Sequence, residues 1–172
     1  MAQVHAGRGP DGVSFPADAD LVEFVYQEAR LIDEKRLDEW YGLFAEDALY
    51  WMPLTRNQPD GELHTSLFYE DRFLLKLRIE RLKRPASYSQ NEPSYCQHVL
   101  QRPQIEARGA KDAPSVVRTP FVYIENQRDN QIVLGGVAWH HLVALDGALR
   151  IRLKKIELLN REAALPSIQL FP

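Results

Sequence analysis

Residues 116–160 decide the fold, and they read VVRTPFVYIENQRDNQIVLGGVAWHHLVALDGALRIRLKKIELLN. β-Branched and aromatic residues dominate this stretch, which is typical of β-strands. Asp146-Gly147 is a strong signal for a tight hairpin turn, and Asp129-Asn130 marks a turn one hairpin earlier. The stretch therefore predicts consecutive antiparallel strands, preceded by one more strand. The predicted strands cover residues 96–108, 116–127, 131–145 and 149–160.

The apolar alternation slips by one position inside the last predicted strand. Ile151 and Leu153 share one face and Lys154 lies on the opposite, outer face, but the next apolar residue, Ile156, follows Leu153 by three positions. Such a slip indicates a β-bulge, which we expect near Lys154-Lys155. Because bulges bend the strand that contains them, we expect a strongly curved antiparallel sheet.

The residues before these strands follow helical spacing. From Asp20 onward, apolar residues recur three and four positions apart, so they share one face of a helix. Asp20 and Glu23 resemble a capping pair at its start. A second short helix is predicted for residues 37–44 and a third for residues 67–82, which Pro85 ends. The apolar face of the first helix comprises Val22, Val25, Ala29 and Ile32.

Helices followed by hairpin-linked strands are typical of an α+β domain rather than of βαβ units. We expect the N-terminal helices to pack in the concave face of the curved sheet, as in a cystatin-like cone. A short strand at residues 49–52, stopped by Pro53, interrupts the helices. Glycine and proline are frequent near the N-terminus, so we expect a flexible arm over residues 1–18 and a single domain over residues 19–172.

The composition fits one globular domain without a nucleic-acid or membrane partner. The chain has 172 residues, 45% of them hydrophobic, and a net charge of −3, so no strongly basic face is expected. No apolar run approaches the length that spans a bilayer. Cys96 is the single cysteine and forms no internal disulfide, which favours a reducing, cytoplasmic location.

The residue inventory does not provide a redox iron site in this chain. A Rieske cluster needs two cysteines and two histidines, and Cys96 is alone. A mononuclear iron site needs two converging histidines and a carboxylate, whereas His140 and His141 are strand neighbours that point to opposite faces. Gly135-Gly136 lies inside a strand and fits close backbone approach better than phosphate binding. We therefore expect no metal and no cofactor in this chain.

Asp33 and His98 form the best candidate acid/base pair. Asp33 ends the first predicted helix, and His98 lies near the start of the first long strand. A carboxylate that holds an imidazole in one tautomer makes a workable general base. A buried hydrogen-bonded pair that only ties the helix to the sheet explains the same two residues, and we favour this alternative.

Two adjoining segments resemble one protein family. Residues 28–40 read EARLIDEKRLDEW, and residues 44–53 read FAEDALYWMP. They strongly resemble the first helix, turn and following strand of aromatic-ring-hydroxylating dioxygenase beta subunits, and YWMP is the most specific part. The likeness runs from Leu21 to the end of the sequence. Further matching segments are residues 71–72, 78–82, 92–94, 98–100, 156–160 and 167–171.

The resemblance implies a nuclear-transport-factor-like cone, as in scytalone dehydratase, and a structural subunit without catalytic residues of its own. It also implies a hexamer for aromatic compound catabolism, in which a trimer of small subunits lies beneath three large (alpha) subunits. The large subunit would hold the Rieske 2Fe-2S cluster and the mononuclear Fe(II). The family usually has a Gly-Arg-Arg segment on a late strand, whereas residues 135–141 read GGVAWHH. This departure leaves the identity of the large subunit open.

Obligate interfaces of this kind are large and rich in aromatic residues and arginine. Simple core packing is an equally good explanation for the aromatic candidates, and exposure on a helix is an equally good one for the arginines. The residues expected at the subunit interface are Tyr50, Trp51, Arg72, Arg78 and Arg81.

Two other functions are compatible with the same cone. A stand-alone lyase or isomerase of the scytalone dehydratase or polyketide cyclase type would use Asp33 and His98, which resemble the dehydratase pair in segment and order. A binding module would instead hold a hydrophobic ligand in the internal pocket. Activity of the purified chain without partner or metal distinguishes the lyase from a structural subunit. The sequence does not identify an aromatic substrate, which the large subunit would set.

Overall fold

The computed structural model describes residues 6–8, 14–83, 93–109 and 113–172. Much of the predicted N-terminal arm and the helix end expected at Pro85 lie outside these residues. Within the arm, β1 (Ala6–Arg8) and β2 (Ser14–Pro16) pair as a small antiparallel sheet.

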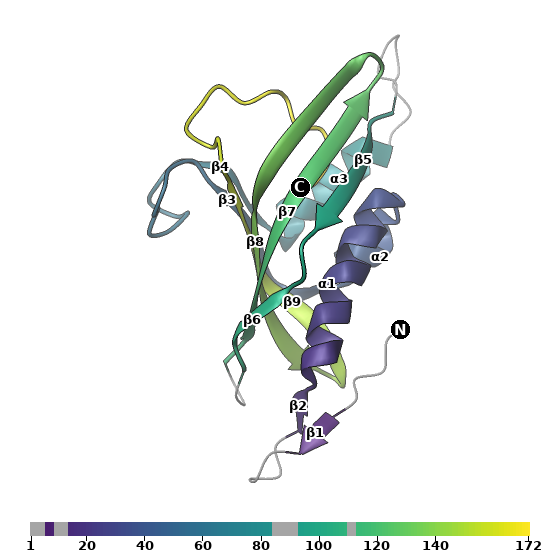
Figure 1. Ribbon diagram of the computed structural model, residues 1–172, viewed down its shortest axis with the longest axis vertical. Coiled ribbons are helices and arrows are strands. Elements are labelled where there is room, and N and C mark those ends of the chain that lie inside the picture. The colour runs from purple at the N-terminus through teal and green to yellow at the C-terminus, as the bar shows by residue number, and fades with distance from the viewer. Residues whose placement is uncertain (1–5, 9–13, 84–92, 110–112) are drawn as a thin grey trace.

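A seven-stranded curled sheet forms the body of the molecule (Figure 1). Its strands are β3 (Phe44–Pro53), β4 (Ser66–Asp71), β5 (Tyr95–Leu100), β6 (Gln104–Ala107), β7 (Ser115–Gln127), β8 (Asn130–Leu145) and β9 (Ala148–Leu158). The order is β4-β3-β9-β8-β7-β5, and β6 also pairs with β7. All pairings are antiparallel except that of β3 with β9, which is parallel. The predicted hairpin run is therefore present, and β3 adds one parallel pairing to it.

Three helices bury their apolar faces against this sheet. They are α1 (Asp18–Asp33), α2 (Leu37–Tyr41) and α3 (Arg72–Lys83), and α1 runs beside β5 (Figure 1). Their buried residues join those of the strands in one core, which confirms the predicted α+β class. None of the described helices is both long and apolar enough to cross a membrane.

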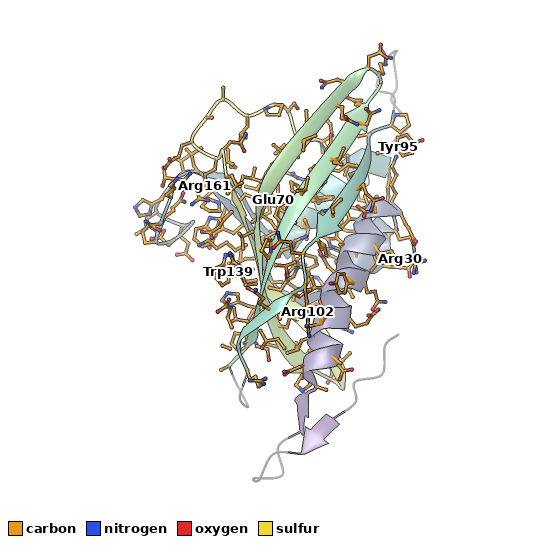
Figure 2. All side chains as sticks on the ribbon, viewed as in Figure 1. Arg30, Glu70, Tyr95, Arg102, Trp139 and Arg161 are labelled. Carbon is orange, nitrogen blue, oxygen red and sulfur yellow. The ribbon has the colours of Figure 1, made fainter. Side chains whose placement is uncertain are left out.

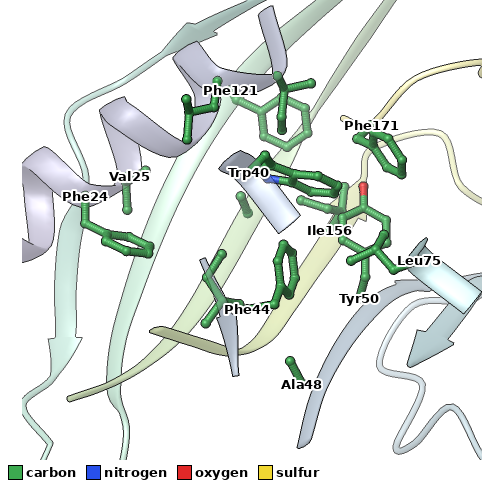
Figure 3. Packing of buried hydrophobic residues seen from close by; sticks show 14 of the residues in the cluster. Phe24, Val25, Trp40, Phe44, Ala48, Tyr50, Leu75, Phe121, Ile156 and Phe171 are labelled. Atoms are coloured by element: carbon green, nitrogen blue, oxygen red, sulfur yellow. The ribbon is translucent and has the colours of Figure 1, made fainter. Parts of the chain in front are cut away.

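Aromatic rings fill the centre of the core (Figure 3). The ring centroid of Trp40 in α2 lies 5.0 Å from that of Phe44 and 4.5 Å from that of Phe171. Tyr50 of β3 packs edge-on against Trp40 and Phe171, and its hydroxyl donates to the carbonyl oxygen of Pro172 at 2.9 Å. Rings from a helix, a strand and the C-terminal segment therefore occupy the interior of the cone.

The first helix begins two residues earlier than predicted. Ala17 is its N-cap residue, and the Asp20 carboxylate accepts a hydrogen bond from the Ala17 N–H at 3.2 Å. Asp20 thus lies in the first turn, and the predicted capping by Asp20 with Glu23 is wrong. A carboxylate there still favours the helix, because the N-terminal end carries the positive end of the helix dipole.

Three other predicted boundaries differ from the structure. Phe44 begins β3 instead of ending the second helix, since α2 stops at Tyr41. Residues 67–71, predicted as helix, belong to β4, where pairing with β3 satisfies their backbone groups. The strand predicted over residues 96–108 is split into β5 and β6, and Pro103, which has no N–H to donate, lies in the gap.

The bulge in β9 lies at Arg152, two positions before the predicted site. His141 of β8 pairs with Leu153, and the next residue, Leu142, pairs with Ile151, so Arg152 is the extra residue. Beyond it the inward position falls on Lys154, which is 2% exposed. The sequence pattern placed Lys154 on the outer face, so the structure corrects this prediction and brings an ammonium group into the interior.

Candidate functional site

Asp33 and His98, the predicted acid/base pair, are in direct contact. Asp33 ends α1, and its Oδ1 lies 2.7 Å from His98 Nδ1. The backbone N–H of His98 donates to the same carboxylate, at 3.2 Å to Oδ1 and 3.1 Å to Oδ2. Gln97 Nε2 donates to Oδ2 at 2.8 Å. The carboxylate therefore fixes the imidazole and ties the end of α1 to β5, a contact that both explanations of this pair require.

Cys96 lies on the same face of β5 as His98, two residues earlier. Its Sγ is 3.7 Å from Asp33 Oδ1. Burial and the neighbouring Asp33 carboxylate raise the pKa of the Cys96 thiol to about 12. Because nucleophilic cysteines react as thiolates, a thiol with a raised pKa is a poor nucleophile.

Sequence reasoning missed a second polar cluster, which is centred on Glu28 of α1. Glu28 and Lys154 are each 2% exposed, and Lys154 Nζ donates to Glu28 Oε1 at 2.8 Å. Trp40 Nε1 donates to the same oxygen at 2.5 Å. His140 Nε2 lies 3.5 Å from Glu28 Oε2, which is long for a hydrogen bond.

These neighbours set the protonation of the cluster. Burial alone would raise the pKa of Glu28, but the Lys154 ammonium and the His140 imidazole together hold that pKa well below its usual range. Burial lowers the pKa of His140, so its imidazole is neutral near pH 7. The interior therefore contains the Glu28–Lys154 ion pair beside a neutral histidine.

One sequence signal for this cluster was present. Glu28 lies three positions after Val25 and four before Ile32, so a carboxylate occupies the apolar stripe of the first helix. Buried carboxylates need a cation or several donors. The sequence did not reveal the cation that pairs with Glu28, because the apolar alternation placed Lys154 on the outer face of the sheet.

A small cavity separates the two polar clusters. Its volume is about 10 Å³, and its lining includes Glu28, His98, Thr119, His140 and Lys154. His98 Nε2, Thr119 Oγ1 and both ring nitrogens of His140 are buried there without a hydrogen-bond partner among the described residues. The space suits about one water molecule, whereas a cavity that binds benzene has about 150 Å³. An aromatic substrate does not fit inside this cone.

The two aromatic interface candidates are mostly buried within the chain. Tyr50 is 1% exposed and its ring is enclosed by Trp40 and Phe171, so core packing is the correct explanation for it. Trp51 is 8% exposed and donates from Nε1 to Ser66 Oγ at 3.0 Å. Tyr50 therefore offers no side-chain surface to a partner.

The three arginine candidates on α3 have different surroundings. Arg72 donates to the carbonyl oxygen of Phe44 at 2.5 Å, so it ties the start of α3 to β3. Arg78 forms an ion pair with Glu70 at 2.7 Å (Glu70 is labelled in Figure 2). Arg81 is exposed. The interface role of these arginines stays a prediction, and Arg81 is the most accessible of them.

The family of this chain follows from a comparison with known protein families. A family model described as ring hydroxylating beta subunit matches residues 27–163. The chain belongs to this family. The beta subunit is thus a component of an aromatic-ring-hydroxylating dioxygenase, an oxidoreductase complex. The resemblance of residues 28–53 to such subunits is confirmed.

Individual relatives agree with this membership. The beta subunit is 29% identical over 158 residues to the small oxygenase component of the p-cumate 2,3-dioxygenase system of Pseudomonas putida, covering 91% of this chain and 86% of that protein. It is also 29% identical over 136 residues to benzene 1,2-dioxygenase subunit beta of Pseudomonas putida, covering 73% and 71%. The crystal structure of the benzoate 1,2-dioxygenase beta subunit of Burkholderia mallei ATCC 23344 has a TM-score of 0.72 at 24% identity, covering 90% and 97%. This structure supports the cone fold.

The residues of the beta subunit do not fit the iron centres of a Rieske oxygenase. One cysteine does not supply the two cysteines of a Rieske cluster. His140 is buried inside the cone while His141 faces the other side of β8, as predicted from their adjacency. Among the described residues, the one group of three potential ligands is Asp33, Cys96 and His98, which has a single histidine.

Proposed function

We propose that this beta subunit is the non-catalytic base of its dioxygenase. Three copies form a trimer that supports three large (alpha) subunits, and the large subunits contain the Rieske 2Fe-2S cluster and the mononuclear Fe(II). The aromatic substrate is then set by the large subunit. A cytoplasmic location, expected from the single Cys96, is part of the same proposal.

The main support is an apolar stripe on the outer face of α3. Phe73 is 68% exposed, Leu74 is 45% exposed and Leu77 is 46% exposed. Leu75 and Ile79, on the opposite face, fill the core. Large apolar side chains that gather on one exposed face usually mark a protein contact. The exposed Arg81 extends this stripe by one further turn, because it follows Leu77 by four residues.

The filled interior supports a structural role over a stand-alone lyase. The contact between Asp33 and His98 favours the lyase, since it orients the imidazole as a base requires. However, His98 Nε2 is buried and faces the internal cavity of about 10 Å³, which admits no substrate larger than water. The same volume argues against a hydrophobic ligand inside the cone.

The variant Phe73→Asp/Leu77→Asp tests the assembly. Both side chains are exposed, so the fold is expected to persist while trimer formation or large-subunit binding is lost. Sedimentation velocity of the full chain, alone and co-expressed with a Rieske-type large subunit, measures the assembly. Val133→Asp is the matched control, because Val133 is 61% exposed on β8. A wild-type chain that stays monomeric and binds no large subunit would refute the proposal.

A metal analysis tests whether the iron belongs to the large subunit alone. Iron is expected in the co-purified complex and not in the isolated beta subunit. The isolated chain is also expected to turn over no aromatic substrate. Stoichiometric iron in the isolated chain, or turnover that Asp33→Ala abolishes, contradicts a non-catalytic role.

A further inference from the structure

Three side chains of different chemistry converge where α1 meets β5. Asp33, Cys96 and His98 each offer one ligand atom, and these atoms lie within 4.8 Å of one another. We infer that this cluster is a binding site for a zinc-like divalent cation, separate from the iron centres of the large subunit. The site has three protein ligands and an open fourth position, and it joins the end of α1 to the edge of the sheet.

Secondary structure holds the three ligands on a rigid frame. Cys96 and His98 are two positions apart on β5, so both side chains point to the same face. Their strand pairs with β7 in continuous register, with Cys96 opposite Glu125 and His98 opposite Tyr123. Asp33, the last residue of α1, is held against them by the backbone N–H of His98. A site built on regular elements varies less in geometry than one built on loops.

Two distances between ligand atoms can be compared with those of a tetrahedral metal site. Zinc bonds of about 2.0–2.3 Å place neighbouring ligand atoms roughly 3.4–3.6 Å apart. Cys96 Sγ and Asp33 Oδ1 are 3.7 Å apart, which already fits. His98 Nδ1 and Asp33 Oδ1 are 2.7 Å apart because they share a hydrogen bond. A cation that replaces this hydrogen bond needs the two atoms to separate by less than about 1 Å.

The two carboxylate oxygens of Asp33 contact different groups. Oδ2 accepts the side-chain amide of Gln97 at 2.8 Å and the His98 N–H at 3.1 Å. Oδ1 faces both Nδ1 of His98 and Sγ of Cys96, and it shares the His98 N–H at 3.2 Å. Gln97 thus orients the carboxylate from outside, as the partners of metal ligands commonly do. Oδ1 remains directed at the other two ligand atoms.

The second nitrogen of His98 is consistent with coordination through Nδ1. The His98 side chain is 4% exposed, and its Nε2 is buried without a hydrogen-bond partner in the part of the chain that the structure describes. Coordination through Nδ1 places the ring proton on Nε2, because a neutral imidazole carries one proton. Nε2–H then points into the cavity, where Thr119 Oγ1 and His140 also lack partners. A histidine that binds a metal usually donates its other N–H, and a water molecule in this cavity would be the acceptor.

Solvent reaches the cluster through an open groove. The groove has a volume of about 610 Å³ and runs between α1 and β5, where its lining includes Asp33, Glu34, Gln97 and His98. Figure 2 labels Arg30, which belongs to its helical wall. A cation therefore has an entry path, and a water molecule from the groove would take the fourth position. On binding, the Cys96 thiol proton passes to solvent as the Sγ–metal bond forms.

The ligand set selects the kind of metal. A thiolate with an imidazole and a carboxylate suits zinc, whereas magnesium and calcium prefer oxygen ligands. The two-histidine iron site has no counterpart here, because His98 is the one histidine of the cluster. The inference is therefore independent of the iron chemistry proposed for the large subunit, and its test does not depend on assembly.

Cobalt(II) titration of the full chain, stripped with a chelator, tests the site. One equivalent is expected to bind at micromolar concentration, with a thiolate-to-cobalt absorption band and the intense visible bands of a tetrahedral ion, and zinc is expected to displace it. Cys96→Ser is expected to abolish the thiolate band and weaken binding at least about tenfold. Asp33→Asn, which keeps the side-chain shape, is expected to weaken binding as well. Circular dichroism checks that each variant is folded.

His64→Ala is the matched control, because His64 and Asp60 are an exposed imidazole–carboxylate pair 3.3 Å apart. Cobalt binding is expected to be unchanged in this variant. The inference is overturned if no saturable spectrum appears at micromolar cobalt, if the spectrum survives in Cys96→Ser, or if it disappears in His64→Ala.

Discussion

At the residue scale, Lys154 places a positive charge in the interior. Its ammonium group is 2% exposed and contacts Glu28, which is equally buried. A buried ion pair contributes little net stability compared with apolar packing, but removing one partner leaves a charge without compensation. Trp40 also depends on this pair, because its indole N–H donates to Glu28.

Lys154→Met is expected to lower the free energy of unfolding by about 3–5 kcal/mol, because Glu28 loses its cation. In Glu28→Gln/Lys154→Met, the glutamine keeps an acceptor for Trp40, so most of the loss is expected to be regained. Urea denaturation of the wild type and both variants gives these free energies. Equal losses in the single and the double variant would show that the two charges are not coupled.

The same pair predicts a pH dependence. The pKa of Glu28 in the folded chain lies well below the unfolded value of about 4.3, so the unfolded state takes up a proton first. The stability from this group is fully present above about pH 4.3 and is lost as the pH falls below it. The wild type is therefore expected to lose more stability between about pH 5 and pH 3 than Glu28→Gln/Lys154→Met. Denaturant curves across this range measure the difference, and parallel acid limbs would contradict the prediction.

At the element scale, the glycine pair in β8 sets how closely two strands and an aromatic ring approach. A Cβ atom at Gly136 would lie 2.7 Å from the carbonyl oxygen of Glu157 and 3.0 Å from the Phe121 ring. At Gly135 it would meet only the flexible Leu159 side chain, at 3.2 Å. The sequence prediction that these glycines permit close backbone approach is thus confirmed for Gly136.

Gly136→Ala is expected to destabilise the chain by about 1–3 kcal/mol, because the Glu157 backbone and the Phe121 ring must move. Gly135→Ala is the matched control and is expected to change stability by less than about 0.5 kcal/mol. Thermal unfolding of the two variants compares them directly. A larger loss in Gly135→Ala than in Gly136→Ala would show that the strand spacing is not set at Gly136.

At the scale of the whole molecule, the C-terminal segment closes the interior of the cone. The buried Glu125 carboxylate of β7 accepts the backbone N–H groups of Gln169 and Leu170, each at 3.1 Å. This anchor directs Phe171 onto Trp40. The subunit thus has a closed interior and an apolar outer face on α3, which suits a protein that acts through its surface.

Phe171→Ala is expected to cost about 3–5 kcal/mol, because a fully buried ring leaves a cavity beside Trp40. Ile168→Ala, in the same segment but only partly buried, is expected to cost clearly less. Denaturant unfolding measures both losses, and small aromatic molecules are expected to raise the melting temperature of Phe171→Ala but not of the wild type. Similar losses in the two variants would mean that the ring does not close the core.

Local patterns predicted most of the elements but not all of their boundaries. Strand alternation and the Asp146-Gly147 turn were sufficient to predict the run of hairpins. Because His140 and His141 are neighbours on one strand, their opposite faces could also be predicted. Residues 67–71 were predicted as the start of the third helix. A short apolar run does not distinguish a helix from a strand, and in the structure these residues pair with β3. The contact of Asp33 with His98 followed from their places at a helix end and a strand start.

The amino-acid sequence by itself determined the α+β class, the C-terminal run of hairpins and the family, because each depends on residues close together in the chain. Only the tertiary structure decided where β9 bulges, and hence that Lys154 points inward to meet Glu28, 126 positions away. It also decided that the interior of the cone is filled. Periodicity records which face of an element is apolar, but the partner of a buried charge and the volume left in a core depend on distant residues that meet only after folding.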